Sequence, residues 1–444
     1  MNDTPHVSPW YTAIAVMAAT FMVVLDTTVV NVSLPYIAGS MSATVNESTW
    51  ALTSYVAANA IILPLTGWLA TVLGRKRLLI GSVIGFTIAS ALCGIAPTLP
   101  LLILFRIIQG ATGGVMQPLS QAVLLEAFPP QDRGKAMGFW GLGIVVAPIL
   151  GPVLGGWLTD NYSWRWVFYI NIPIGVIAFM LLREFVHDPP YLKRHSESID
   201  YWGIALMTIG IGALQIMLDK GQEDDWFEST LITTMGYPPI QAGIALAPRG
   251  MGSLIAMPLV GLITSKVDSR KLVALGLLMG GVTLLWLGDL NLNAGYWDFF
   301  WPQFLQGVSL GLLFVPLSTV TMGAIPREQV GNAASVFNLV RNIGGGVGIA
   351  SVTTMLTRFR VEHAATMGEH ISLYDARIRA QVGPLTDVRA VAGLQGQVMR
   401  QAALMSFIDS FRIMGVVFLA LLPLVLLMRR QAPHGSEQVV VATE

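Results

Sequence analysis

Runs of apolar residues about 20 long, separated by short polar segments, extend over most of the chain. An α-helix needs about 20 residues to cross a hydrocarbon core about 30 Å thick, so each run has the length of a transmembrane span. The pattern predicts an all-α integral membrane protein with about twelve spans. They are expected at 12–37, 48–71, 77–96, 98–124, 134–160, 164–183, 200–219, 240–265, 271–290, 297–322, 335–357 and 404–428.

Basic residues are concentrated in alternate short loops, which predicts the orientation of the spans because such loops stay cytoplasmic. The basic loops carry Arg75, Lys76 and Arg77; Arg133 and Lys135; Arg183, Lys193 and Arg194; Lys266, Arg270 and Lys271; Arg327; and Arg429 and Arg430. The opposite short loops hold little beyond Arg165 and Lys220. The segment 358–403 carries six arginines, but it is long and outside, where charge contributes weakly. Both termini are therefore expected in the cytoplasm.

An internal repeat divides the chain into two related halves. The stretch 67–76 is echoed at 261–271, an offset of 194 residues, and 106–110 is echoed at 303–307, an offset of 197. The short sequence 134–136 returns at 331–333, again 197 residues later. We therefore expect an N-terminal six-helix bundle at 1–185 and a C-terminal bundle at 240–430 with an external loop at 358–403. Residues 186–239 would form a central loop, the helix 200–219 and an external loop, and 431–444 a cytoplasmic tail.

Composition excludes several classes of function. Charged residues make up 12% of the chain, about half of what soluble domains carry, and 26 basic and 26 acidic residues balance, which gives no reason to expect a nucleic-acid partner. One cysteine, Cys93, excludes internal disulfides and a cysteine-based metal site. The glycine run 344–348 lies in an apolar helix with no strand before it, so it does not predict a nucleotide loop. Without a metal cluster or nucleophile constellation, no enzyme activity, catalytic residue or cofactor is predicted.

Four stretches carry a resemblance to a known family. Residues 25–35 read Leu-Asp-Thr-Thr-Val-Val-Asn-Val-Ser-Leu-Pro, 67–76 form a loop motif after the second span, Arg106 is followed by Gln109 and Gly110, and 143–156 is rich in glycine and proline. With 164–173 and 337–345, they resemble the major facilitator superfamily and, within it, the EmrB/QacA group of drug:proton antiporters. The resemblance implies a two-bundle fold and a proton gradient as the energy source, with no cofactor.

Two departures separate the chain from that group. The loop motif usually has an acid where this chain has Thr71. The group typically has about fourteen helices, and the sequence around 226–237 looks like a join from which a second central helix and the first helix of the C-terminal half are absent. The span 200–219 then falls where that half needs its first helix. The chain is either a working short form or a transport-dead remnant that acts only as a membrane binding or assembly partner.

Two charged residues inside spans are candidates for proton coupling. Asp26 lies near the middle of the first span, where an unpaired carboxylate is costly, so it must be protonated, paired or hydrated. Arg106 in the fourth span is the expected counter-charge, and the resemblance associates that position with proton transfer. Structural roles are the alternatives: a cap or a hydrogen bond to Asn31 for Asp26, and a clamp on backbone carbonyls for Arg106. By contrast, four acids are expected at span ends in water: Glu126, Asp200, Asp219 and Asp409.

Further candidates fall into two sets. The substrate cavity or coupling network is expected to include Asn31, Gln109, Asn338 and Arg341. The conformational and packing motif is expected to include Gly67, Gly74, Arg75, Lys76, Gly143, Pro148, Gly151, Pro152, Gly155 and Gly156.

The resemblance implies export of an amphipathic, often cationic, drug in exchange for protons. Export of a metabolite or siderophore is the same-class alternative. The implied location is a bacterial inner membrane, and the implied partners are the lipid bilayer, a small amphipathic substrate and, in double-membraned bacteria, a periplasmic adaptor and an outer-membrane duct. Segment 358–403 is the predicted adaptor contact.

Overall fold

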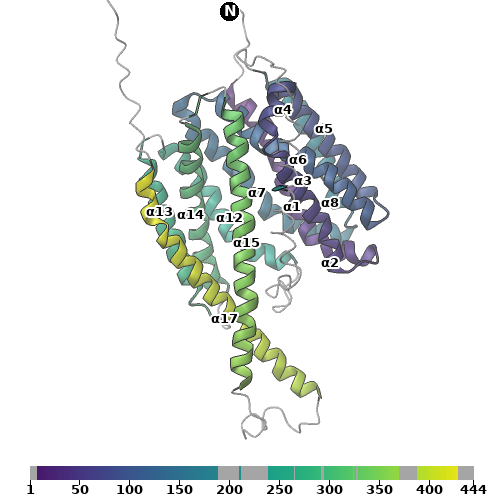
Figure 1. Cartoon of the computed structure of the whole chain (residues 1–444), viewed down its shortest axis with the longest axis vertical. Coiled ribbons are helices and arrows are strands. Elements are labelled where there is room, and N and C mark those ends of the chain that lie inside the picture. Colours follow the sequence, from purple (N-terminus) through teal and green to yellow (C-terminus); the bar gives the residue numbers. More distant parts are fainter. Residues whose placement is uncertain are drawn as a thin grey trace, which may run out of the picture.

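The computed structural model describes residues 8–188, 210–211, 239–264, 266–291, 295–323, 325–326, 329–369 and 388–428. The regular elements of these residues are helices, arranged in two groups that pack side by side (Figure 1). The first group contains α1 (Pro9–Ser40), α2 (Val45–Ser48), α3 (Trp50–Ile62), α4 (Thr66–Leu73), α5 (Arg75–Ile95), α6 (Leu99–Ala127), η1 (Pro130–Asp132), α7 (Arg133–Asn161), α8 (Trp166–Tyr169) and α9 (Asn171–Phe185). The second contains α12 (Pro239–Ile263), α13 (Ser269–Leu287), α14 (Tyr296–Gly323), α15 (Val330–Glu369), α17 (Val388–Ala420) and η3 (Leu422–Leu427).

Helices of the described residues lie at eleven of the twelve expected spans. Eight are long and apolar enough to cross a membrane, and α3 with α4 makes a ninth that is bent by 60°. The bend lies at Pro64, which has no N–H to continue the helix. Two further expected spans, 240–265 and 335–357, coincide with α12, whose apolar part is Ala247–Ile263, and with part of α15, whose hydropathy is lowered by polar residues. The expected span 200–219 lies outside the described residues except for 210–211, as does nearly all of 186–239.

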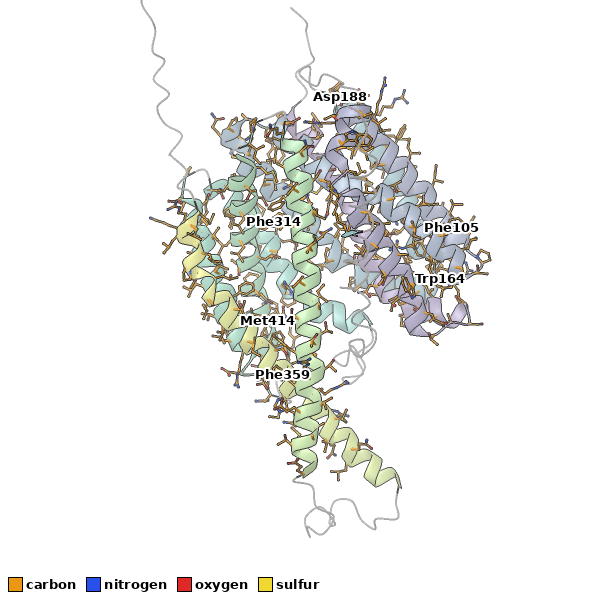
Figure 2. All side chains as sticks on the ribbon, viewed as in Figure 1. Phe105, Trp164, Asp188, Phe314, Phe359 and Met414 are labelled. Carbon is orange, nitrogen blue, oxygen red and sulfur yellow. The ribbon has the colours of Figure 1, made fainter. Side chains whose placement is uncertain are left out.

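Close contacts between α7 and α12 join the two groups. A Cβ on Gly134 would lie 2.8 Å from the carbonyl oxygen of Gly261, and one on Gly138 would lie 2.6 Å from that of Met257. These two helices can therefore approach closely only because glycine is present. In the same interface, Phe314 of α14 (Figure 2) stacks on Trp140 of α7, with ring centroids 5.9 Å apart.

The sequence repeat coincides with a repeated contact between the halves. Gly261, in the second copy of the loop motif, faces Gly134, in the first copy of the short Gly-x-Ala repeat. The reciprocal pair is Gly67, in the first loop motif, against Asn332, in the second Gly-x-Ala repeat; a Cβ on Gly67 would lie 3.1 Å from Asn332 Cα and closer still to its side chain. The loop-motif glycine of each half thus packs on the Gly-x-Ala sequence of the other half. Both contacts lie at the end of the bundle predicted to be cytoplasmic.

The described parts of segment 358–403 are helical rather than irregular. Helix α15 continues to Glu369, and α17 begins at Val388. Both helices project past the rest of the bundle, at the end opposite α4 (Figure 1). They are joined by His363 and Asp409, whose Nε2 and Oδ2 atoms lie 2.7 Å apart. Asp409, expected at a span end in water, is partly exposed but has this partner.

Candidate functional site

Asp26 lies in the middle of α1 with no solvent exposure. The hydroxyl groups of its neighbours Thr27 and Thr28 donate to carbonyl oxygens of the preceding turn of α1, at 2.9 Å from Val24 and Leu25 respectively. The two threonines therefore satisfy their own hydroxyls within the helix, and the carboxylate of Asp26 must find its partners on other helices.

Three side chains from two other helices donate to the Asp26 carboxylate. Arg106 of α6 donates from its NH1 group to Oδ2 at 2.5 Å. The amide of Gln109, one turn later on α6, donates to Oδ1 at 2.9 Å, and the amide of Asn171 at the start of α9 donates to the same atom at 2.7 Å. Both carboxylate oxygens are hydrogen-bonded, which is what a buried ionised carboxyl group requires.

Arg106 is held in place by contacts beyond Asp26. Its Nε donates to the carbonyl oxygen of Ala51 at 2.9 Å, and NH1 also donates to Gln109 Oε1 at 2.8 Å. The guanidinium lies over the ring of Tyr55, with its Cζ 4.1 Å from the ring centroid, a cation–π geometry. From the sequence, pairing with Asp26 and binding to a backbone carbonyl are alternatives for Arg106. In the structure its guanidinium makes both interactions.

Asn171 and Ser90 belong to this network and are absent from the sequence-based set of site residues. Asn171 Nδ2 lies 3.0 Å from the hydroxyl oxygen of Ser90 on α5, and that hydroxyl donates to the carbonyl oxygen of Phe168 at 2.8 Å. The signal that could have identified Asn171 is an amide within an apolar run. Asn31 is not in the network: it is exposed, one turn along α1 from Thr27.

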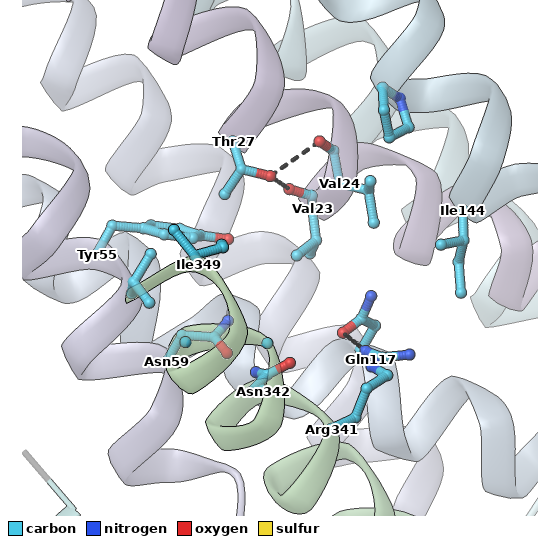
Figure 3. A pocket seen from close by; sticks show the side chains of 14 residues that line it. Val23, Val24, Thr27, Tyr55, Asn59, Gln117, Ile144, Arg341, Asn342 and Ile349 are labelled. Atoms are coloured by element: carbon cyan, nitrogen blue, oxygen red, sulfur yellow. Dashed lines mark hydrogen bonds between the residues drawn. The ribbon is translucent and has the colours of Figure 1, made fainter. Parts of the chain in front are cut away.

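A cavity of about 440 Å³ lies between the halves, lined by α1, α3, α6, α7 and α15 (Figure 3). Its apolar residues are Val23, Val24, Val56, Ile144, Pro148 and Ile349, and its other side chains are Thr27, Tyr55, Asn59, Gln117, Arg341 and Asn342. Arg341 donates from NH2 to Oε1 of Gln117 at 2.9 Å, which ties α15 to α6. One turn away on each helix, Asn338 donates to Gln121, also across the halves.

Tyr55 connects the cavity to the ion pair. Its side chain lines the cavity, and the same ring lies under the guanidinium of Arg106. On α1, Thr27 lines the cavity, whereas Asp26 is turned to the network behind it. A compound in the cavity would therefore be separated from the Asp26–Arg106 pair by one aromatic ring.

The glycines of α7 allow close packing on α1 as well as on α12. Gly143 faces Met17, Gly151 faces Thr28, and a Cβ on Gly155 would lie 3.0 Å from the carbonyl oxygen of Val29. Gly156 is buried, and Pro148 and Pro152 lie within the helix. Helix α7 is thus packed between α1 and α12, one from each half.

The loop motif forms an ion pair that the sequence did not indicate. Arg75 pairs with Glu126 at the end of α6, and both side chains are largely buried. The expectation that Glu126 meets water is wrong, because the guanidinium of Arg75 covers it. Gly74 precedes Arg75 with φ 84°, a backbone conformation that glycine adopts without strain. Thr71, which replaces the usual acid, donates to the carbonyl oxygen of Trp68 on its own helix.

Lys76 ties the loop motif to the end of the first half. Its backbone N–H donates to Oδ1 of Asp188 at 2.7 Å, and its Nζ donates to the carbonyl oxygen of Arg183 at 2.6 Å. Asp188 lies at the end of the molecule where α4 and α5 meet (Figure 2). The connection fixes the start of α5 against the residues that follow α9.

Comparisons with known proteins agree on one family. A family model described as Major Facilitator Superfamily matches residues 16–349. The chain is 34% identical to the fatty acid resistance protein FarB of Neisseria gonorrhoeae, over 94% of this chain and 96% of that protein. It is also 34% identical to the multidrug export protein EmrB of Escherichia coli K12, over 93% of this chain and 94% of that protein. Both alignments span 486 positions, more than the 444 residues here, so these relatives contain residues that this chain lacks.

Solved structures show the same fold at low sequence identity. The proton:xylose symporter XylE matches with a TM-score of 0.65 at 14% identity, over 95% of this chain and 96% of that chain. The human organic anion transporter MFSD10 matches with a TM-score of 0.63 at 13% identity, over 93% of this chain and 100% of that chain.

Proposed function

The chain belongs to the major facilitator superfamily, and we propose that it exports amphipathic compounds in exchange for protons across a bacterial inner membrane. It is a multi-pass membrane protein with the two-bundle fold, about twelve transmembrane helices and cytoplasmic termini. Relatives that it matches over nearly their whole length are named for multidrug export and for fatty acid resistance. Its energy source would be the proton gradient, with no cofactor.

The observation that carries the proposal is the fully buried Asp26–Arg106 pair beside the cavity. Buried ionisable groups within spans are costly, so they are retained where they serve transport or proton transfer. Here the carboxylate is the proton acceptor, and Arg106, Gln109 and Asn171 hold its ionised form. The guanidinium of Arg106 then remains charged whether or not Asp26 carries a proton.

Proton binding to Asp26 would change the balance between the two states of the carrier. A proton on Oδ2 neutralises Asp26 and leaves the guanidinium of Arg106 buried without its counter-ion, which costs several kcal/mol. A conformation in which water reaches Arg106 avoids this cost, so protonation of Asp26 favours that conformation. A proton shifts a conformational equilibrium only by the difference between its affinities for the two states. Tyr55 would transmit the movement of Arg106 to the cavity wall.

The glycine contacts support alternating access by rocking of one half against the other. The reciprocal contacts of Gly67 with Asn332 and of Gly134 with Gly261 close the cytoplasmic end in this conformation. In the other state these contacts would open while the outer ends of the helices approach. Substrate would enter from the cytoplasm in that state and leave to the outside in the present one.

The test is transport by purified protein in proteoliposomes under an imposed pH gradient, with a fluorescent amphipath as substrate. Gradient-dependent accumulation supports antiport. The same assay on a chain with about seventy residues of a relative restored near Thr230 separates a working short form from a remnant. Transport only after restoration would show that the chain as it stands cannot turn over.

We also propose that the projecting ends of α15 and α17 bind a periplasmic adaptor that leads to an outer-membrane duct. They extend beyond the outer end of the bundle, and Val361 on α15 is largely exposed there. Co-purification of the cognate adaptor should be lost when residues 365–398 are deleted. Equal recovery of the adaptor with the deleted protein would contradict this contact.

A further inference from the structure

The cavity between the halves has a positive charge in an otherwise uncharged lining. Of the fourteen residues that line it in the described part of the chain, Arg341 is the one charged side chain. The walls on either side are aliphatic, with Val24 on α1, Ile144 on α7 and Ile349 on α15. A compound in this cavity therefore meets one cationic group and several apolar surfaces.

The charge of Arg341 is not neutralised by its hydrogen-bond partner. Gln117 offers an amide oxygen at 2.9 Å, which accepts a hydrogen bond but carries no net charge. The buried arginines Arg106 and Arg75 differ from half-buried Arg341 in this respect, since Arg106 contacts Asp26 and Arg75 contacts Glu126. A guanidinium has five donors, so Arg341 has donors to offer a ligand after binding Gln117.

Space for a ligand lies beside this guanidinium. Gly345 is one turn further along α15 and lines the same cavity, and a Cβ added to it would meet no heavy atom within 4 Å. The neighbouring Gly344 and Gly348 are equally open. These glycines therefore do not serve close helix packing in this conformation, in contrast to those of α7. At Gly345 the absence of a side chain leaves room in the cavity itself.

We propose that Arg341 makes this cavity selective for amphipathic anions such as carboxylates and sulfonates. The proposal rests on the proposed export function and narrows its substrate class, replacing the cationic compounds expected from the sequence resemblance. The anionic group lies on the guanidinium, where hydrogen bonds between charged partners are stronger than in water, and the apolar part lies against the aliphatic walls. A cationic amphipath is disfavoured by the like charge and has no acidic partner among the described residues that line the cavity.

The test is equilibrium binding of three probes with one ring system: 1-pyrenebutanoate, 1-pyrenebutanol and pyrenebutyltrimethylammonium. The protein is placed in uncharged nanodiscs without a pH gradient, and binding is read from energy transfer from tryptophan to pyrene. The wild-type chain should bind the anion at least about tenfold more tightly than the cation, with the alcohol between them. Arg341→Gln should reduce the affinity for the anion to about that for the alcohol, and Arg341→Lys should keep the order of the three.

Gln117→Glu provides a second variant that leaves Arg341 in place. The new carboxylate has the shape of the amide and lies within hydrogen-bond distance of the guanidinium, so it neutralises the charge without changing the cavity volume. It should weaken binding of the anion and strengthen binding of the cation. If the wild-type chain binds the cation as tightly as the anion, or if neither Arg341→Gln nor Gln117→Glu changes the order, the proposal is overturned.

Failure of this proposal and failure of proton-driven export give different results. The binding order is measured without a gradient and does not depend on Asp26. If the protein does not bind the anion more tightly than the alcohol and the cation, while gradient-driven transport persists, only the proposed anion selectivity is wrong. If the order is present while no gradient drives transport, the cavity is anion-selective in a protein that does not couple to protons.

Discussion

Asn338 of α15 donates a hydrogen bond to Oε1 of Gln121 on α6 at 2.9 Å, and neither side chain is exposed to solvent. Together with the contact between Arg341 and Gln117, it forms two polar links between the halves on the cytoplasmic side of the cavity. A buried hydrogen bond of this kind must break when the halves separate at this end. The pair therefore contributes to the stability of the present conformation relative to the cytoplasm-open one.

Asn338→Ala should shift the protein toward the cytoplasm-open conformation. The lost hydrogen bond is worth about 1 kcal/mol, and the buried amide oxygen of Gln121 loses its donor, which adds about 1–3 kcal/mol. Spin labels at the exposed residues Leu73 and Gln329 would report a larger fraction of long distances. Ser351→Ala is the matched control, since that hydroxyl bonds within α15 and is exposed. An unchanged distance distribution in Asn338→Ala would show that the link does not hold this end closed.

Gly67→Ala should impair closure of the cytoplasmic end. The added Cβ would overlap the side chain of Asn332, and overpacking of this kind costs about 1–3 kcal/mol. We expect transport to fall at least about tenfold while the protein remains in the membrane. Gly81→Ala on α5 is the control, because a Cβ there would meet nothing within 4 Å and alanine favours helix. Equal transport by the two variants would contradict the role of this contact.

Tyr55→Leu should uncouple the cavity from the ion pair, whereas Tyr55→Phe should keep most of the coupling. The ring under Arg106 contributes about 0.5–2 kcal/mol by the cation–π interaction, and phenylalanine retains a ring while leucine does not. The measurement is the number of protons exchanged per substrate in proteoliposomes, which should fall in Tyr55→Leu. An unchanged ratio in Tyr55→Leu would remove Tyr55 from the connection.

Sequence alone could indicate the charged residues of the candidate site because charges are rare in spans. Asp26 and Arg106 stand out in apolar runs, and the structure places them in contact. The sequence gives no comparable signal for Asn171, Ser90 and Tyr55, because uncharged polar and aromatic residues are common in membrane helices. Only the folded arrangement shows that Asn171, distant in the chain, donates to Asp26.

The features that the sequence predicts wrongly or not at all also depend on contacts between residues that are distant in the chain. Glu126 lies near the end of an apolar run, which suggested contact with water, but its burial depends on Arg75 from another helix. The projecting parts of α15 and α17 are helical without the long apolar runs that identify spans, because helix ends outside the bilayer need none. The internal repeat was visible in the sequence, and its reciprocal contacts across the halves required the structure.

Asp26→Asn is the variant that tests proton coupling most directly. The amide keeps the shape of the carboxyl group and can accept hydrogen bonds from Arg106, but it cannot take up a proton. It leaves the buried guanidinium of Arg106 without its counter-ion, which costs several kcal/mol in the present conformation, so the variant must be compared with the wild-type chain at equal protein content. Arg106→Lys should be nearly as damaging, because a compact ammonium cannot contact Asp26, Ala51 and Gln109 as the planar guanidinium does.

The decisive measurement is transport of a pyrene amphipath by Asp26→Asn in proteoliposomes, at the same protein content as the wild-type chain, under an imposed pH gradient. The account predicts that the gradient drives no accumulation in this variant, while exchange of labelled for unlabelled substrate without a gradient persists. Gradient-driven accumulation at the wild-type rate would contradict it and would remove Asp26 as the proton carrier.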